Sequence, residues 1–166
     1  MTEFDVIDLT SALTDNGKQH KFTLSATLQN DLLSYPDAYF VGEVTVCGQY
    51  DYINPVATVQ GVIDFTISAL CDRCCDRITK QFLIEFNTEF SQEEVSEEEC
   101  YLLEGTKLNI QKAVEDEIVL ALPISILCQE NCKGLCPKCG INLNKSTCSC
   151  DTAKGNAFSV LKNIKF

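Results

Sequence analysis

The sequence predicts an α+β fold, in which an antiparallel β-meander or partly closed sheet is covered by one amphipathic helix and followed by a cysteine-rich appendage. Three observations predict it: alternating apolar and polar residues over most of 40–90, helical periodicity over about 109–122, and six cysteines within 128–150. The chain therefore divides into an acidic, β-rich body, residues 1–127, and a cysteine-rich tail, residues 128–166. At 166 residues with 45% hydrophobic content, it is long enough to form a core.

The strands are predicted from side chains that alternate in steps of two. Residues 40–49, 57–69 and 78–90 show this pattern, as does the earlier stretch 21–28, which follows a short strand within 4–9. The apolar or small side of the middle stretch consists of Ala57, Val59, Gly61, Ile63, Phe65, Ile67 and Ala69. Adjacent one-sided strands with short connections predict a meander with one wet face and one packed face.

A helix is predicted after the last strand as the cover for the packed face. Asn109 is a plausible N-cap, and Pro123 ends the pattern. The apolar positions recur three and four residues apart, at Ile110, Ala113, Val114, Ile118, Ala121 and Leu122. The preceding stretch, 91–104, holds six glutamates and no basic residue, so we expect a solvated connector there. Residues 157–164 are expected to form a short terminal helix.

The cysteine stretch carries the pattern of a metal knuckle. Cys136 and Cys139 are three apart with Gly140 after the second, so the backbone can turn tightly and point amide groups at sulfur. Cys148 and Cys150 follow after eight residues, a separation at which a second loop can complete a tetrahedral sulfur shell. The predicted metal ligands are therefore Cys136, Cys139, Cys148 and Cys150. Zinc is favoured because nothing in the stretch matches the ferredoxin cysteine runs.

Two further tail cysteines are alternative metal ligands in this zinc-knuckle appendage. Cys128 and Cys132, four apart, could replace members of the Cys148/Cys150 pair, whose single intervening residue makes it hard for both sulfurs to reach one ion. The alternative is a tail stapled by disulfides, which is disfavoured because nothing else in the chain is typical of a secreted protein. Cys47 and Cys100 are expected to be ordinary buried or half-buried thiols.

A second cysteine pair, Cys71 and Cys74, lies in the predicted turn between the two longest strands. Three interpretations stay open for it: half of a second metal site completed by two tail cysteines, a redox-active dithiol, or a structural turn with reduced thiols. The count favours the second site over the dithiol, because this pair and the six tail cysteines provide eight sulfurs. Thioredoxin-type chemistry would need the first cysteine at a helix N-terminus, which the pattern does not predict.

Charge and composition limit the function classes. Residues 1–127 carry a net charge of −15 and residues 128–166 a net +4. A body this acidic repels a phosphate backbone and favours a basic protein as partner, while solubility alone is the alternative explanation of the charge. No apolar run of about 18 residues occurs, and the N-terminus carries acids where a signal peptide would be basic, so we expect neither export nor membrane insertion, and a reducing cytoplasm as the compartment.

Enzyme chemistry is not expected, and neither is a small-molecule substrate. The single histidine, His20, is predicted to lie exposed in a polar loop, and the chain has no glycine-rich phosphate loop. Two rival functions remain. One is a direct RNA-binding zinc ribbon that uses Lys133, Lys138 and Lys145, although no aromatic residue lies there to stack a base. The other is a dithiol oxidoreductase that uses Cys71 and Cys74.

The combined pattern resembles the YceD-like family, bacterial and plastid proteins linked to accumulation of large-subunit (23S) ribosomal RNA. The residues that carry the resemblance are the Cys-Asp-Arg-Cys of 71–74, the acidic connector, the Leu-Ala-Leu-Pro of 120–123, the CKGLCPKCGINLN run of 132–144 and the Cys-Ser-Cys of 148–150. The resemblance implies a zinc-containing, non-catalytic factor in ribosome biogenesis that supports rRNA processing. At 155–157 the chain has Gly-Asn-Ala where the family has Asp-Pro-Arg, so no role of that arginine carries over.

These inferences combine into one hypothesis of mechanism. The acidic body binds a basic ribosomal or assembly protein, and the zinc-ordered tail with its lysines contacts that partner or adjacent rRNA.

Overall fold

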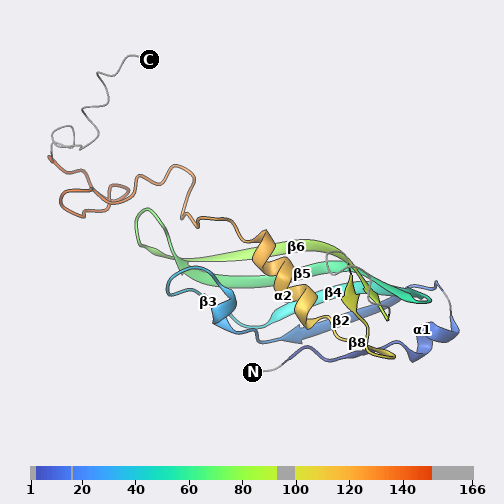
Figure 1. Ribbon diagram of the computed structural model, residues 1–166. Coiled ribbons are helices and arrows are strands. Elements are labelled where there is room, and N and C mark those ends of the chain that lie inside the picture. The colour runs from blue at the N-terminus through green and yellow to red at the C-terminus, as the bar shows by residue number, and fades with distance from the viewer. Residues whose placement is uncertain (1–2, 16, 93–99, 151–166) are drawn as a thin grey trace, which may run out of the picture. The chain divides into compact units, whose positions relative to one another are not determined.

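The computed structural model describes residues 3–15, 17–92 and 100–150 (Figure 1). The chain forms two compact units. Unit 1 comprises Met1–Ala69 and Ile78–Ile124, and unit 2 comprises Leu70–Arg77 and Ser125–Phe166. Unit 2 thus includes a turn between two strands, which the division expected at residue 127 left with the body. The expected terminal helix and most of the acidic connector lie outside the described residues.

A mainly antiparallel sheet forms the framework of unit 1, as the alternating pattern predicts. Its strands in order are β2 (His20–Ala26), β4 (Val44–Ile53), β5 (Val56–Leu70), β6 (Arg77–Ser91) and β7 (Tyr101–Leu102), with β3 (Tyr39–Phe40) beside β5. The succession β2, β4, β5, β6 is the expected meander, and its long hairpin β5–β6 leads into the turn of unit 2. Across the described residues the sheet stays open, with β2 at one edge and β7 at the other.

One face of the sheet is packed. On β5 the predicted apolar side chains are buried except at Gly61, and β4 buries Val44, Val46, Tyr50 and Tyr52 on its own alternating positions. The Phe65 ring contacts Phe40 edge to face at 5.9 Å between centroids and stacks on Phe82 at 5.3 Å. These contacts make the aromatic side chains the centre of the core of unit 1.

Helix α2 (Gln111–Ala121) lies across the packed face (Figure 1). Its residues Ala113, Val114 and Ile118 are fully buried, and burial of the Val114 and Ile118 side chains stabilises the fold by about 1.5–3 kcal/mol each. The N-cap residue is Ile110, one position later than predicted. Asn109 still serves the helix start, because its side-chain oxygen accepts a hydrogen bond from the Gln111 amide at 2.9 Å.

Several short elements carry little or no periodic signal, and of these only a short strand within 4–9 was predicted. Strand β1 (Ile7–Asp8), the only regular strand in the stretch 4–9, pairs with β8 (Lys107–Leu108) in a separate two-stranded ribbon. Helix α1 (Thr10–Thr14) and the 3-10 turn η1 (Asn30–Leu32) follow in chain order. The expectation of a connector throughout 91–104 is wrong at its end, because β7 pairs in parallel with the end of β6. No helix in the described part of the chain is long and apolar enough to cross a membrane.

Strands β4 and β5 face each other at a pair of glycines, Gly48 and Gly61. A Cβ added at Gly48 would lie 2.4 Å from the backbone oxygen of Gln60, and one added at Gly61 would lie 2.4 Å from that of Cys47. Both neighbours are backbone atoms that cannot turn away. The two strands can therefore pair here only because both facing residues lack a side chain.

We expect Gly48→Ala to lower the free energy of unfolding by about 1–3 kcal/mol, because the new methyl group forces β4 away from β5. Urea unfolding followed by circular dichroism measures the effect. The matched control is Cys47→Ala on the same strand, whose exposed side chain should change stability by less than about 0.5 kcal/mol. Equal stability of the two variants would contradict the close approach.

Candidate metal centre

Unit 2 gathers eight of the eleven cysteines into two groups. Cluster 1 consists of Cys71, Cys74, Cys128 and Cys132, and cluster 2 of Cys136, Cys139, Cys148 and Cys150. Within each cluster the four sulfurs lie within 4.8 Å of one another, an arrangement that could hold a metal ion. The four residues predicted as ligands thus come together in cluster 2. The two alternates, Cys128 and Cys132, join the hairpin cysteines instead of replacing Cys148 and Cys150.

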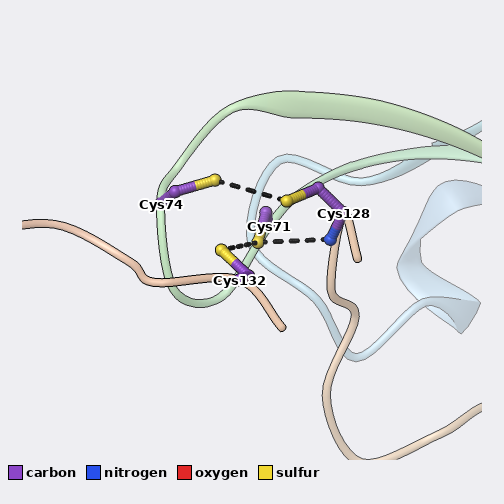
Figure 2. A group of neighbouring side chains, drawn as sticks. All are labelled: Cys71, Cys74, Cys128 and Cys132. Carbon is purple, nitrogen blue, oxygen red and sulfur yellow. Dashed lines mark hydrogen bonds between the residues drawn. The ribbon is translucent and has the colours of Figure 1, made fainter. Parts of the chain in front are cut away.

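The sulfur spacing in cluster 1 fits a shared ion and excludes disulfides (Figure 2). The Cys71 and Cys132 sulfurs are 3.8 Å apart, and those of Cys74 and Cys128 are 3.7 Å apart. A disulfide would need about 2.05 Å. Four sulfurs arranged tetrahedrally around an ion at about 2.3 Å would be separated by about 3.8 Å. All eleven cysteines are free thiols, so the disulfide-stapled tail is not what the structure shows.

The two Cys-x-x-Cys turns have the same backbone conformation. The Cys71 amide donates to the Asp76 carbonyl at 2.9 Å, and the Cys136 amide donates to the Ile141 carbonyl at 2.8 Å. The residue after the second cysteine, Cys75 or Gly140, donates its amide to the first cysteine's carbonyl at 2.9 Å in both turns. Both also have positive φ, +58° at Cys75 and +72° at Gly140. Unit 2 therefore contains two metal knuckles, and Cys75 stands at the position where glycine is usual.

The knuckle amides make the first thiol of each turn more acidic. At Cys136, the amides of Cys139 and Lys138 lower the pKa to about 6. At Cys71, burial opposes ionisation, but hydrogen bonds from the amides of Cys128, Arg73 and Cys74 together lower the pKa to about 6. The amide of Cys128 lies 3.4 Å from the Cys71 sulfur (Figure 2). At Cys132, burial again opposes ionisation, but hydrogen bonds from the Asn144 side chain and the Gly134 amide also lower the pKa. Each cluster thus has at least one sulfur prepared as a thiolate, the form that binds metals.

Other sulfurs in the clusters resist ionisation in the presence of their neighbours. The Cys139 sulfur, together with burial, raises the pKa of Cys150 to about 12. The Asp76 amide favours the Cys74 thiolate, yet burial and the neighbouring sulfurs of its cluster raise that pKa to about 12. Four sulfurs this close can all be ionised only when a cation shares their charge. A donor set of four thiolates, with no oxygen or nitrogen ligand, fits a thiophilic ion such as zinc.

Polar groups of the hairpin turn tie it to the tail within unit 2. The Asp72 carboxylate accepts a hydrogen bond from the Ile126 amide at 2.7 Å, and the Arg73 guanidinium donates to the Cys132 carbonyl at 3.1 Å. The Arg73 carbonyl in turn accepts the Leu135 amide at 3.0 Å. These contacts bring the two halves of cluster 1 together, although 54 to 61 residues separate them in the chain.

Sequence reasoning missed the polar residues around the sulfurs. Asp72 and Asp76, which flank the hairpin cysteines, and Asn142 and Asn144, in the loop between Cys139 and Cys148, all make side-chain hydrogen bonds inside unit 2. They could have been found in the sequence as short polar side chains that lie within two residues of a metal knuckle or inside its loop. The remaining cysteines lie outside both clusters: Cys47, expected to be buried or half-buried, is exposed, as is Cys75, and Cys100 is half-buried.

Comparison with known proteins identifies the family of the chain. The sequence profile of the family described as "Large ribosomal RNA subunit accumulation protein YceD" matches residues 59–165, a span that includes both clusters. The chain belongs to this family. No solved structure matches it.

Two curated relatives share part of the chain. The "Large ribosomal RNA subunit accumulation protein YCED homolog 1, chloroplastic" of Arabidopsis thaliana is 36% identical over 63 residues, which cover 37% of this chain and 20% of the relative. The Zea mays protein of the same name is 39% identical over 59 residues, or 35% of this chain and 20% of the relative. The matched segments thus span about a fifth of the length of these relatives.

We expect the protein to bind two metal ions per chain, and Cys74→Ser to bind one, because the substitution removes a sulfur from cluster 1 only. Elemental analysis of protein purified without chelator measures the stoichiometry. Cys75→Ser is the matched control: it changes the next residue, whose sulfur is exposed and outside the cluster, and should keep two ions. Two ions in the Cys74→Ser protein would contradict the cluster assignment.

Metal removal should loosen unit 2 and leave unit 1 folded, since bound thiolates contribute folding free energy. After chelation we expect trypsin to cut at Lys133 and Lys138 about tenfold faster or more, while the strand signal in circular dichroism persists. Restoring the metal should restore protection. Unchanged cleavage after verified metal loss would mean that the tail holds its shape without an ion.

Proposed function

We propose that this protein is a non-catalytic zinc-containing factor that supports accumulation of large-subunit ribosomal RNA by binding a basic ribosomal or assembly protein. The observation that carries the proposal is that the family match, residues 59–165, extends over both sulfur clusters. The names of the plant relatives, which state large ribosomal RNA subunit accumulation, support the same role. We further propose the cytoplasm as its compartment, although both relatives are described as chloroplastic.

Zinc in these clusters would have a structural role. A cluster that provides four cysteine sulfurs fills every position of a tetrahedral ion and leaves none for a water molecule or a substrate. Catalytic zinc sites keep one such position open. The clusters therefore support a function of shaping a surface rather than of chemistry at the metal.

The charge distribution supports a basic protein as partner. Unit 1 has five lysines and no arginine against twenty acidic residues, a net charge of −15. Such a surface attracts cationic proteins and repels phosphate. Unit 2 has a net charge of +4 with its thiols neutral, and two ions each held by four thiolates would lower this to zero. A metal-loaded unit 2 therefore provides little general attraction for RNA.

The positions of the reactive residues support a non-catalytic role. The only histidine, His20, lies at the start of β2, where its half-buried ring stacks on Tyr50 at 5.4 Å between centroids; the exposed loop position predicted for it is wrong. Cys71 and Cys74 are 0% and 2% exposed, whereas a dithiol oxidoreductase needs an accessible attacking sulfur. We therefore place the oxidoreductase hypothesis behind the adaptor. If the parent protein reduces insulin and Cys71→Ser abolishes that activity, the oxidoreductase hypothesis would be favoured over the adaptor.

In its native cell, we expect loss of the protein to lower large-subunit rRNA relative to small-subunit rRNA by about twofold or more, because unassembled rRNA is degraded. Quantification of the two rRNA species measures this. The parent gene should restore the ratio, Cys75→Ser should restore it equally well, and Cys74→Ser should not. An unchanged ratio in the absence of the protein would contradict the proposed role.

Filter binding separates the adaptor from a direct RNA-binding protein. The probes are transcripts of large-subunit rRNA, offered to the zinc-loaded protein with and without a preparation of basic ribosomal proteins. Retention that needs the added proteins supports the adaptor. Retention of RNA by the protein alone near physiological salt, with a steep loss as salt rises, would favour the zinc-ribbon alternative and its exposed Lys133.

A further inference from the structure

The loop between Cys139 and Cys148 belongs to cluster 2 by sequence, yet it lies beside the segment that connects the two clusters. The Leu143 amide donates to the Gly134 carbonyl at 2.9 Å, and Leu135 and Asn142 form an antiparallel bridge. Residues 141–144 therefore run back along residues 132–136. The ends of this loop are fixed by the sulfurs of cluster 2.

Asn144 extends from this loop to a sulfur of cluster 1. Its side-chain nitrogen donates to the Cys132 sulfur at 3.2 Å, and its side-chain oxygen accepts the Lys133 amide at 2.8 Å. The same oxygen lies 3.3 Å from the side-chain nitrogen of Gln129. A donor to a ligand sulfur fixes the orientation of that ligand and stabilises its negative charge. Asn144 thus contacts cluster 1 although the ends of its loop are set by cluster 2.

The same loop also holds the hairpin half of cluster 1. The Asp76 carboxylate accepts a hydrogen bond from the Asn142 side chain at 2.9 Å and pairs with the Lys145 ammonium at 2.9 Å. Asp76 lies two residues after Cys74, and its backbone carbonyl accepts the Cys71 amide. One loop therefore touches both chain segments that provide the sulfurs of cluster 1.

We propose that Asn144 is a positioning residue for the ion of cluster 1, and that the two clusters bind their ions cooperatively. An ion in cluster 2 orders the loop that brings Asn144 to Cys132, so cluster 1 binds its ion more tightly when cluster 2 is filled. By linkage the effect is reciprocal. The inference rests on the proposed function only in requiring that both clusters hold zinc, and it is independent of the partner and of rRNA.

Asn144→Asp tests the sulfur contact while it keeps the contact with the Lys133 amide, although it also removes the donor to the Asn142 side-chain oxygen at 3.0 Å. Aspartate keeps an oxygen for the Lys133 amide but loses the donor to the Cys132 sulfur. Zinc release to a coloured chelator should show two phases, assigned with Cys74→Ser, which lacks cluster 1, and Cys139→Ser, which lacks cluster 2. We expect Asn144→Asp to weaken zinc binding at cluster 1 roughly 10- to 100-fold while cluster 2 is filled, and to leave zinc binding at cluster 2 within about twofold when cluster 1 is empty.

Asn131→Asp is the matched control. It makes the same substitution on an exposed residue next to Cys132, so it adds the same charge near the same sulfur without removing a donor. We expect the zinc affinities reported by both release phases to stay within about twofold of those of the parent protein. With cobalt in place of zinc, the charge-transfer band should change for one ion of Asn144→Asp and for neither ion of Asn131→Asp. General damage to the fold would instead alter both ions.

Cooperativity is tested by emptying cluster 2. The double variant Cys148→Ser/Cys150→Ser should bind one ion, at cluster 1, roughly tenfold or more weakly than the parent does. On this background, the further substitution Asn144→Asp should weaken zinc binding at cluster 1 by less than about twofold, because the loop no longer holds residue 144 beside Cys132. Parent-like binding at cluster 1 in Asn144→Asp, or in the double variant, would overturn the proposal. A failed rRNA assay with intact cooperativity would overturn the proposed function alone.

Discussion

Mutual repulsion of closely packed thiolates is the constraint on which unit 2 depends. Its buried cluster consists of Cys71, Cys74 and Cys132 with Leu127 packed against them, so sulfur takes the place that aliphatic side chains hold in an ordinary core. Three buried thiols and one leucine provide too little apolar area to fix a chain segment. A cation shared by the four sulfurs both removes the repulsion between the thiolates and links the chain segments that carry them. We therefore expect metal binding and folding of unit 2 to be coupled.

Unit 1 has a different source of stability. Its core is a face of aliphatic and aromatic side chains on β4, β5 and β6 beneath α2, built from the period-two and helical patterns of the sequence. The long β5–β6 hairpin belongs to both units. Its strands lie mostly in unit 1, and its turn provides Cys71 and Cys74 to unit 2. Cys71 and Cys74, for which the sequence left three interpretations open, are half of cluster 1.

The parts of this structure that repeat locally could be predicted from sequence. The strand alternation, the helix that ends before Pro123 and the knuckle around Cys136 and Cys139 each depend on neighbours within a few residues. A second site completed by two tail cysteines was one of the interpretations that the sequence left open. Which tail cysteines complete it could not be predicted, because this depends on the hairpin meeting a segment more than fifty residues later. The knuckle at Cys74 was also hidden, since Cys75 occupies the left-handed position where a glycine would have marked it. Strand β7 has only two residues and no periodicity to detect.

Charge connects the metal centre with the proposed role. With its thiols protonated, unit 2 carries +4 and would attract phosphate; with two ions, each held by four thiolates, it carries none. Metal loading thus removes the only net positive charge in a chain whose other unit carries −15. A loaded protein has no long-range attraction for RNA and a strong one for cationic proteins. Ribosomal proteins are themselves the cations that neutralise rRNA. We therefore propose that a factor of this charge meets the large subunit through its proteins, and that the metal clusters give the contact surface its shape and not its charge.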